Sequence, residues 1–393
     1  MVTKNTEVQR CDAANRAMPV VPPLSNNARS DSVDTNITHE GSALDDVRAR
    51  AFHGLDEASR PYAWRMLLGV TQKHQSEEEV AALREKRAQY HQWRKRFQTY
   101  RPQPQPTEPE MDSKSNGKLL ATFAEQALLQ DVALMKEIEK DVSRTQSDLA
   151  FFSVGGIQQQ WMLRILFVYA KLNPELGYMQ GMNEILAPLV YVFGSDERDE
   201  WANETEPDAF YAFSEVMRSV KVLYSKSPSD PAKTGVDMQM IRLNVLLRQH
   251  DAPLWQHLVC QLLIALTCNA ETDSRTSYQN SIGLSPDFYS FRWYMTLLAR
   301  EFPMPMTLRI WDALLADPKR FSFLHYVSCA LIRSQRSSVL QLGFTAALKS
   351  LQTLSDVNVE LVLHQAEHMR DKDRHADQSR LQVGSTVRIQ SSS

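Results

Sequence analysis

The chain has 393 residues, of which 43% are hydrophobic and 23% are charged, and its formal net charge is −3 at pH 7. This length allows a large buried core, in one domain or two. The nearly balanced charge argues against nucleic acid or an anionic membrane as the main partner, so we expect no nucleic-acid binding. Scarce strand signals, long segments with helical periodicity and only 13 glycines predict an all-α fold.

Both ends of the chain are polar and weakly periodic, which predicts disordered tails at residues 1–42 and 371–393. Between them we expect one domain, over residues 43–370. A polar, Pro-rich stretch at 101–118 interrupts this domain. Helical patterns resume on both sides of the stretch, so we expect it to be a surface insertion.

Helical signals follow one another along the first half of the domain. In the short segment SRPYAWRMLLG, Pro61 suits a first helical turn and Trp64 lies on an apolar face. The helix that starts at residue 157 is apolar almost all round from Trp161 to Ala170, so we expect it to be buried. The expected helices of this half span about residues 42–54, 59–69, 77–97, 128–142, 157–173 and 182–193.

The helix expected at 77–97 interleaves basic and aromatic side chains. These are Arg84, Lys86, Arg87, Tyr90, Trp93, Arg94, Lys95, Arg96 and Phe97. They could contact anionic lipid or an acidic partner surface. The alternative is a solvated helix whose aromatic residues pack on the domain, and we favour it because four glutamates dilute the positive charge.

In the second half, Ser285, Pro286 and Asp287 form a helix start signal before the segment FYSFRWYMTLLAREFP. Four apolar residues of this segment share one helical face: Phe288, Phe291, Met295 and Leu298. A further short amphipathic helix is expected at 307–318.

Metal and targeting signals are weak throughout the chain. The four cysteines are Cys11, Cys260, Cys268 and Cys329. They form no CxxC pair and no zinc-type spacing with histidine. His364, Glu367 and His368 match the zinc pattern H-x-x-E-H, but no convincing third ligand accompanies them, so we predict no metal site. No secretory signal, spanning segment or lipid-anchor motif is evident, and we expect a cytoplasmic protein.

Two short segments carry polar residues that suit phosphate chemistry. In IEKDVSRTQ (138–146), Asp141 and Arg144 share a helical face, as a solvated ion pair or as an arginine positioned toward a partner's phosphate. In GYMQG (177–181), a turn between two core helices, Gln180 can donate and accept hydrogen bonds without charge. That capacity is needed to orient a water molecule toward phosphorus. Gly177 and Gly181 leave room for the approach of another backbone.

No phosphate-binding loop of the G-x-x-x-x-G-K-[ST] or G-x-G-x-x-G type is present, so we expect no nucleotide cofactor of the chain's own. An arginine that stabilises phosphate charge and a glutamine that orients water therefore predict assistance given in trans. A nucleotide, with its Mg²⁺, would be carried by another protein.

Three motifs in order carry a family resemblance: RPYAW (60–64), IEKDVSRT (138–145) and GYMQGMNE (177–184). They resemble the R-x-x-x-W, I-x-x-D-x-x-R and Y-x-Q motifs of the TBC-domain Rab GTPase-activating proteins, and the likeness extends over about residues 43–340. It implies a V-shaped TBC domain of two helical subdomains and a dual-finger mechanism. Arg144 would be the arginine finger and Gln180 the glutamine finger. The supporting residues would be Asp141, Tyr178, Gly181, Asn183, Arg60 and Trp64, the last two as structural props beside the site.

The resemblance implies a Rab-family small GTPase in its GTP form as the partner, with GTP and Mg²⁺ carried by that partner. It also implies a role in vesicle trafficking, with only peripheral contact with endomembranes through the Rab. One alternative is a Rab-binding scaffold with the same fold and no catalytic role, although a scaffold would be expected to lack Arg144 or Gln180. The other is an all-α interaction protein with chance motif matches.

Overall fold

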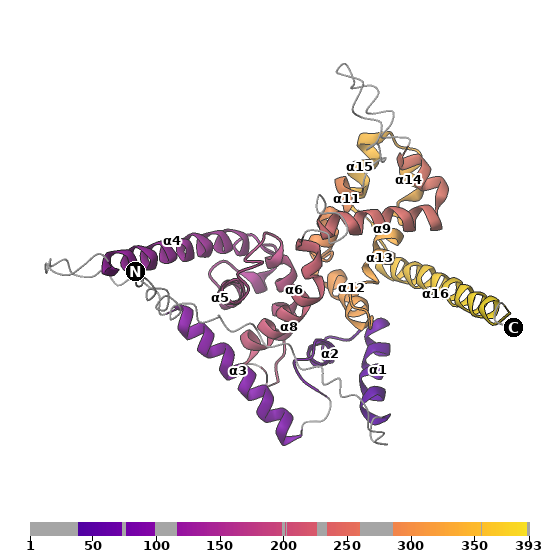
Figure 1. The fold of residues 1–393 in the computed structure, drawn as a ribbon. Coiled ribbons are helices and arrows are strands. Elements are labelled where there is room, and N and C mark those ends of the chain that lie inside the picture. The colour runs from indigo at the N-terminus through magenta and orange to yellow at the C-terminus, as the bar shows by residue number, and fades with distance from the viewer. Residues whose placement is uncertain are drawn as a thin grey trace, which may run out of the picture.

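Helices make up the fold in the computed structural model, which describes residues 38–72, 76–98, 116–198, 201, 203–225, 234–259, 286–354 and 356–390. No strand occurs among these residues, which confirms the predicted all-α class. The elements in chain order are α1 (Thr38–Phe52), α2 (Arg60–Leu67), α3 (Glu77–Gln98), α4 (Asn116–Val142), the 3₁₀ helix η1 (Ala150–Phe152), α5 (Ile157–Leu172), α6 (Met182–Gly194), α8 (Thr205–Val220), the 3₁₀ helix η2 (Lys221–Tyr224), α9 (Gly235–His250), α11 (Asp287–Met295), α12 (Met304–Ala316), α13 (Leu324–Ser334), α14 (Arg336–Val339), α15 (Phe344–Thr353) and α16 (Val359–Gln390) (Figure 1).

The helices form two groups that diverge from a common contact region, in a V (Figure 1). The first group contains α2–α6 and α8, and the second contains α9 and α11–α16. Helix α12 joins the two groups, because α1, α2 and α6 all pack against it. Within the part of the chain that the structure describes, no helix is both long and apolar enough to cross a bilayer.

Helices α5 and α6 are the centre of the first group. Every residue of α6 from Met182 to Val190 is buried, and so is every residue of α5 from Ile165 to Ala170. The prediction that these are core helices is therefore confirmed. Burial of both helices holds the short turn between them in one position, and that turn carries the GYMQG segment.

The aromatic residues of α3 face the domain, in agreement with the interpretation that we favoured. Tyr90 and Trp93 are buried, and the Tyr90 hydroxyl donates to Glu206 Oε1 at 2.7 Å. Arg94 Nη1 lies 3.1 Å from the other oxygen of Glu206, and Arg87 pairs with Asp208. Half of the basic side chains expected on this helix are exposed: Arg84, Lys95 and Arg96.

A fully buried arginine ties α2 to α8. Arg65 Nε lies 2.9 Å from Asp208 Oδ2, and its Nη1 lies 2.6 Å from Asp196 Oδ2. The guanidinium also lies 4.5 Å from the ring centres of Phe193 and Trp201. Because both carboxylates and both rings face one cation, the buried charge is compensated from several sides.

The expected tails and insertion differ from the structure at their edges. Helix α1 begins at Thr38, so residues 38–42 are helical rather than part of a disordered tail. Residues 116–118 of the expected insertion belong to α4. Residues 1–37, residues 101–115 and the three cysteines Cys11, Cys260 and Cys268 lie outside the described residues.

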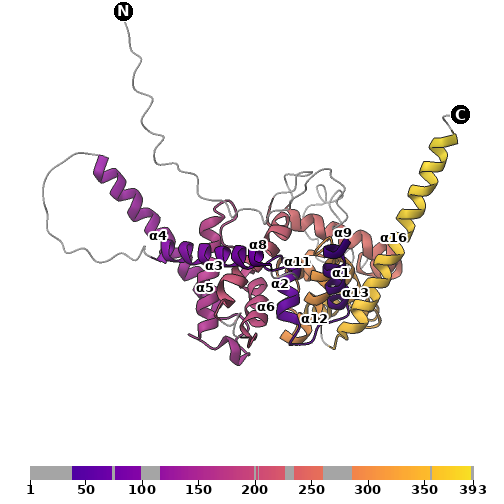
Figure 2. The same ribbon diagram turned by 90° about the horizontal axis from the view of Figure 1, so that it is seen from below.

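The prediction of a disordered tail after residue 370 was wrong as far as Gln390, because α16 continues to that residue. Figure 2 shows α16 extending away from the body of the domain toward the C-terminus. Asp373 anchors this part of the helix. It accepts from Gln249 Nε2 at 2.7 Å and from the Tyr326 hydroxyl at 3.2 Å, and it lies 3.0 Å from His250 Nε2.

Helix α11 is shorter than predicted and packs through a different face. It ends at Met295, and Leu297 and Leu298 follow in the left-handed region, with φ of 50° and 63°. Tyr289 and Trp293 are buried, whereas Phe288 and Phe291 are 52% and 43% exposed. After Met295 the chain leaves the helix, and the two leucines that follow are buried in the core. The predicted face assumed that the helix continued past Met295, and it was therefore the wrong one.

Asp312 on α12 accepts hydrogen bonds from two residues of the RPYAW motif. It accepts from Trp64 Nε1 at 2.7 Å, from Arg60 Nε at 3.1 Å and from the Leu55 backbone amide at 3.0 Å. The Trp64 ring also stacks on Trp311, with ring centres 5.8 Å apart. Arg60 and Trp64 therefore join α2 to α12.

We expect Asp312→Ala to lower the free energy of unfolding by about 3–5 kcal/mol, because the Arg60 guanidinium and the Trp64 indole would lose their buried acceptor. Urea denaturation measures this loss. Asp45→Ala is the control, since that carboxylate is 68% exposed and pairs with Arg48 in an i,i+3 contact. A loss below about 1 kcal/mol for Asp312→Ala would show that the fold does not depend on this junction.

Candidate functional site

Arg144 lies in the turn that follows the last residue of α4. Its Nη2 lies 2.6 Å from Asp141 Oδ1, and its Nε donates to the Lys140 carbonyl oxygen at 3.1 Å. These two contacts fix the base of the guanidinium, yet the side chain remains 60% exposed. An arginine held in this way can still offer hydrogen-bond donors to an anion that arrives from outside.

The turn between α5 and α6 carries Gln180 on its surface. Gly177 and Gly181 have φ of +66° and +104°, a region that side-chain-bearing residues rarely adopt. A Cβ atom on Gly177 would contact nothing within 4 Å, and one on Gly181 would lie 3.6 Å from Met295 O. The backbone conformation, rather than crowding within the chain, therefore requires both glycines. Gln180 is exposed, and its side chain makes no hydrogen bond to any described residue.

Asn183, in the first turn of α6, connects the two loops. Its Nδ2 donates to Thr145 Oγ1 at 2.8 Å, and its Oδ1 accepts from the Gly181 backbone amide at 3.1 Å. Thr145 Oγ1 in turn donates to the Asp141 carbonyl oxygen at 2.9 Å. One buried carboxamide therefore holds the residue after Arg144 and the residue after Gln180.

Asp141 makes a second connection between the loops. The Tyr178 hydroxyl donates to its Oδ2 at 2.8 Å, while Oδ1 faces Arg144. Burial and then the hydrogen bond to Asp141 raise the pKa of Tyr178, so the hydroxyl stays protonated and remains a donor. The carboxylate thus aligns Arg144 from one side and Tyr178 from the other.

The structure brings together most of the residues that the sequence predicted for the site. Asp141, Arg144, Tyr178 and Asn183 form one hydrogen-bonded cluster, and Gly181 donates its backbone amide to that cluster. Arg60 and Trp64, expected as structural props beside the site, bond to Asp312 and not to this cluster.

Sequence reasoning missed Thr145. Its only signal is its position four residues after Asp141, the spacing at which a hydroxyl can bond to a helical carbonyl oxygen.

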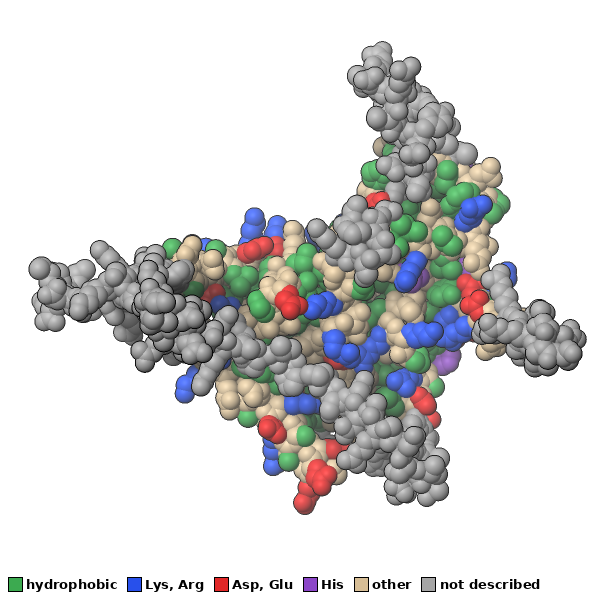
Figure 3. All heavy atoms as spheres, in the orientation of Figure 1, with side chains coloured by type: hydrophobic (Ala, Val, Ile, Leu, Met, Phe, Trp, Pro, Cys, Tyr) green, Lys and Arg blue, Asp and Glu red, His purple; other side chains and the backbone are tan. Residues whose placement is uncertain are grey.

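The cluster lies where the two groups of helices meet. Gln146 Nε2 donates to the Ala299 carbonyl oxygen at 3.4 Å, and Gly181 faces Met295 and Thr296. Both contacts reach the turn after α11, which belongs to the second group. Lys and Arg side chains gather in the middle of the face in Figure 3, near the meeting of the two groups.

Glu184 is a buried carboxyl group next to Asn183 in α6. Its Oε1 lies 3.5 Å from Asn183 Nδ2. Burial raises the pKa of Glu184, the charge of Arg300 opposes this effect, and the charge of Asp141 adds to it. The motif contains this residue, but the sequence alone gave no reason to single it out.

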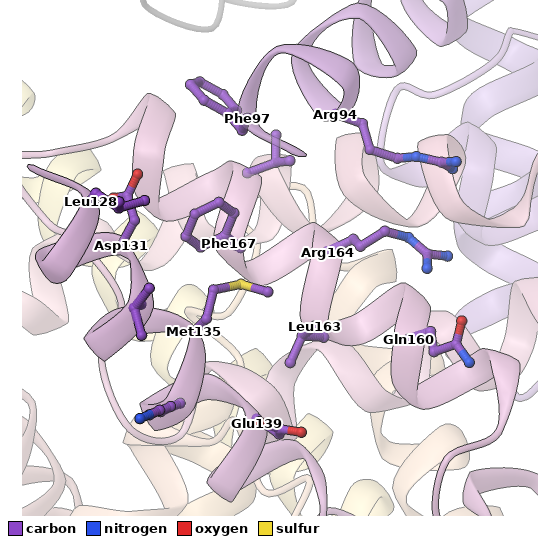
Figure 4. A pocket seen from close by; sticks show the side chains of 13 residues that line it. Arg94, Phe97, Leu128, Asp131, Met135, Glu139, Gln160, Leu163, Arg164 and Phe167 are labelled. Carbon is purple, nitrogen blue, oxygen red and sulfur yellow. The ribbon is translucent and has the colours of Figure 1, made fainter. Parts of the chain in front are cut away.

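A separate groove lies between α3, α4 and α5 (Figure 4). Its volume is about 660 Å³, and it contains none of the predicted site residues. The lining residues are Arg94, Phe97, Leu128, Asp131, Val132, Met135, Lys136, Glu139, Gln160, Leu163, Arg164, Phe167 and Val168.

Comparison with known proteins adds a family match. Residues 57–340 match the model of the Rab-GTPase-TBC domain. Human TBC1 domain family member 13 is 34% identical over 218 residues, which cover 55% of this chain and 49% of that protein. The GTPase-activating protein gyp1 of Schizosaccharomyces pombe is 25% identical over 344 residues, which cover 82% of this chain and 57% of that protein.

A solved structure shares the fold. The crystal structure of the Ypt/Rab-GAP domain of Gyp1p superimposes with a TM-score of 0.63 at 19% identity, covering 85% of this chain and 93% of that one. The chain spans about half the length of the human relative.

We expect Glu184→Gln to raise the free energy of unfolding at pH 7, because the neutral amide avoids the cost of burying a carboxylate. The usual pKa of this side chain is 4.5, and burial raises it in the folded chain. As the pH rises above 4.5, the unfolded chain loses its proton first, so the wild type becomes less stable relative to the variant. The difference between them should therefore shrink as the pH falls toward 4.

Urea denaturation between pH 4 and pH 8 measures this difference. Glu175→Gln is the matched control, since Glu175 is 81% exposed and its substitution should change stability little at any pH. A Glu184→Gln variant that is less stable than wild type at pH 7, or whose difference does not vary with pH, would contradict the expectation.

Proposed function

The chain belongs to the Rab-GTPase-TBC domain family, and on that premise we propose that it accelerates GTP hydrolysis by a Rab-family small GTPase. One observation carries the proposal. An exposed arginine and an exposed glutamine stand on two loops that a single buried carboxamide, that of Asn183, holds together. The matching family and the function printed in the name of the yeast relative also support it.

In this proposal the partner GTPase arrives in its GTP form and brings its own Mg²⁺. Arg144 places its guanidinium against the phosphate oxygens, where it offsets the negative charge that develops as the γ-phosphoryl group passes from GDP, the leaving group, to the attacking water. Because the planar guanidinium offers two parallel donors, it suits two phosphate oxygens at once. The chain itself then needs no nucleotide-binding loop.

Gln180 takes the second role. Its carboxamide accepts a hydrogen bond from the attacking water and donates one, so it can hold that water in line with the phosphorus atom. The side chain is exposed and has no hydrogen bond to any described residue that would have to break first. The left-handed conformations of Gly177 and Gly181 present it at the surface of the turn.

The remaining residues of the cluster act through these two. Asp141 orients Arg144, and Tyr178 orients Asp141. Asn183 and Thr145 keep the two loops at a constant separation, which lowers the cost of assembling the site when the partner binds. A Rab would bring the complex to its own endomembrane, where the activity would regulate vesicle trafficking.

We expect Arg144→Ala to reduce the stimulated rate of GTP hydrolysis by roughly 10³-fold or more, because an arginine supplied in trans contributes ~10³–10⁵ in rate. Arg144→Lys should be nearly as severe, since an ammonium group is a point charge without the planar fork. Phosphate release from a panel of GTP-loaded Rab GTPases measures both. Arg218→Ala is the matched control, because Arg218 is 58% exposed and also pairs with a carboxylate in an i,i+3 contact.

We expect Gln180→Ala to lower the same rate by roughly 10²-fold, the usual cost of removing one group that stabilises or orients in the transition state. Its circular dichroism and melting temperature should equal those of the wild type, since the side chain is exposed. The scaffold alternative predicts another outcome. A GTP-loaded Rab would bind the wild type without faster phosphate release, and neither Arg144→Ala nor Gln180→Ala would change the rate of hydrolysis.

A further inference from the structure

The loop that precedes α5 exposes apolar side chains. We define the Val154 loop as residues 153–157. Val154 is 82% exposed, the highest value among the large hydrophobic side chains that the structure describes, and Ile157 is 46% exposed. From Leu149 to Gln160 the sequence contains no charged residue. A single exposed valine is ordinary, but this one stands on a loop whose backbone is held by internal hydrogen bonds.

Internal hydrogen bonds fix the conformation of the Val154 loop. The Gly156 backbone amide donates to the Ser153 carbonyl oxygen at 2.9 Å, and the Gly155 amide donates to Gln159 Oε1 at 3.1 Å. Gly155 has a φ of +76°, which favours glycine at the tip. The loop therefore presents Val154 outward from a defined backbone.

Gln159 connects the Val154 loop to the base of the Arg144 turn. Its side chain is buried, and its Nε2 donates to the Phe152 carbonyl oxygen at 3.1 Å and lies 3.5 Å from that of Val142. Val142 is the last residue of α4 and precedes Arg144 by two residues. One carboxamide thus contacts both the loop that exposes Val154 and the end of α4, two residues before Arg144.

We propose that the Val154 loop is a second contact point for the partner GTPase, and that Gln159 is the positioning residue that fixes its distance from Arg144. The inference rests on the proposed function, because the occupant is the GTPase that Arg144 would engage. The loop would cover an apolar patch of that GTPase. Burial of Val154 would then contribute to affinity and to the choice of partner, while the chemistry would stay with Arg144 and Gln180.

The chemistry of the loop favours a protein surface over a lipid surface. Segments that dock on anionic membranes combine apolar residues with Lys and Arg, whereas the sequence from Leu149 to Gln160 has neither. A contact through apolar burial alone should also depend little on salt.

The test is the dependence of phosphate release on GTPase concentration, with the Rab GTPase that the wild type accelerates most. We expect Val154→Ser to raise KM roughly tenfold, the effect of losing one buried valine, and to leave kcat within about twofold. Val154→Ile should have the KM of the wild type, because isoleucine keeps the apolar contact. Val245→Ser is the matched control, since Val245 is 60% exposed on α9, in the other group of helices.

The role of Gln159 is tested by a double-mutant cycle. If Gln159 positions the Val154 loop relative to Arg144, then Val154→Ser should raise KM clearly less in a Gln159→Leu background than in the wild type. If Gln159 has a purely structural role, Gln159→Leu would lower the fraction of active protein, and Val154→Ser would raise KM by the same factor in both backgrounds. That result would overturn the positioning role.

The contact itself is overturned if the wild type accelerates a Rab but Val154→Ser has the same KM as Val245→Ser. It is also overturned if Val154→Ser leaves KM unchanged and instead reduces sedimentation with phosphatidylcholine–phosphatidylserine vesicles, because the loop would then dock on lipid. In both cases the proposed function would stand. If the wild type accelerates no Rab, the proposed function fails, and this inference fails with it.

Discussion

The arrangement of the site depends on the hydrogen bonds of the Asn183 side chain. Its two polar atoms bond to Thr145 and to the Gly181 amide, and so they tie a turn after α4 to a turn before α6. The shared carboxylate of Asp141 reinforces the connection. Since two loops from different elements would otherwise move independently, this small cluster sets the separation between Arg144 and Gln180.

The core supports that cluster from below. Helices α5 and α6 are buried over most of their length, so the turn between them cannot shift without disturbing the packing of the first group. The second group contributes through the turn after α11, which meets Gln146 and Gly181. The helices hold the two loops in place, while the side chains of Arg144 and Gln180 stay exposed.

The sequence predicted that most residues of the cluster would lie together, because they belong to two short motifs whose spacing already implies contact. It also predicted the class of fold and the burial of α5 and α6, because a helix that is apolar almost all round must be buried in the core. The ion pairs of Arg65 were not predictable, because Asp208 lies 143 positions away and neither residue signals the other. The packed face of α11 was misjudged because the left-handed leucines after Met295 end the helical repeat. Helix α16 was missed because its anchor, Asp373, finds its partners on α9 and α13.

Helix α16 belongs to the folded domain although it lies beyond the region that matches the family. The family match ends at residue 340, yet Val362, Ala366 and Met369 are buried, and α16 packs along α13 and α12. A chain cut at the edge of the recognised domain would uncover the parts of α13 and α12 on which α16 packs, and α12 is the helix that joins the two halves of the V. Proteolysis at that edge would leave the loops of Arg144 and Gln180 in the chain but would weaken the junction between the two groups of helices.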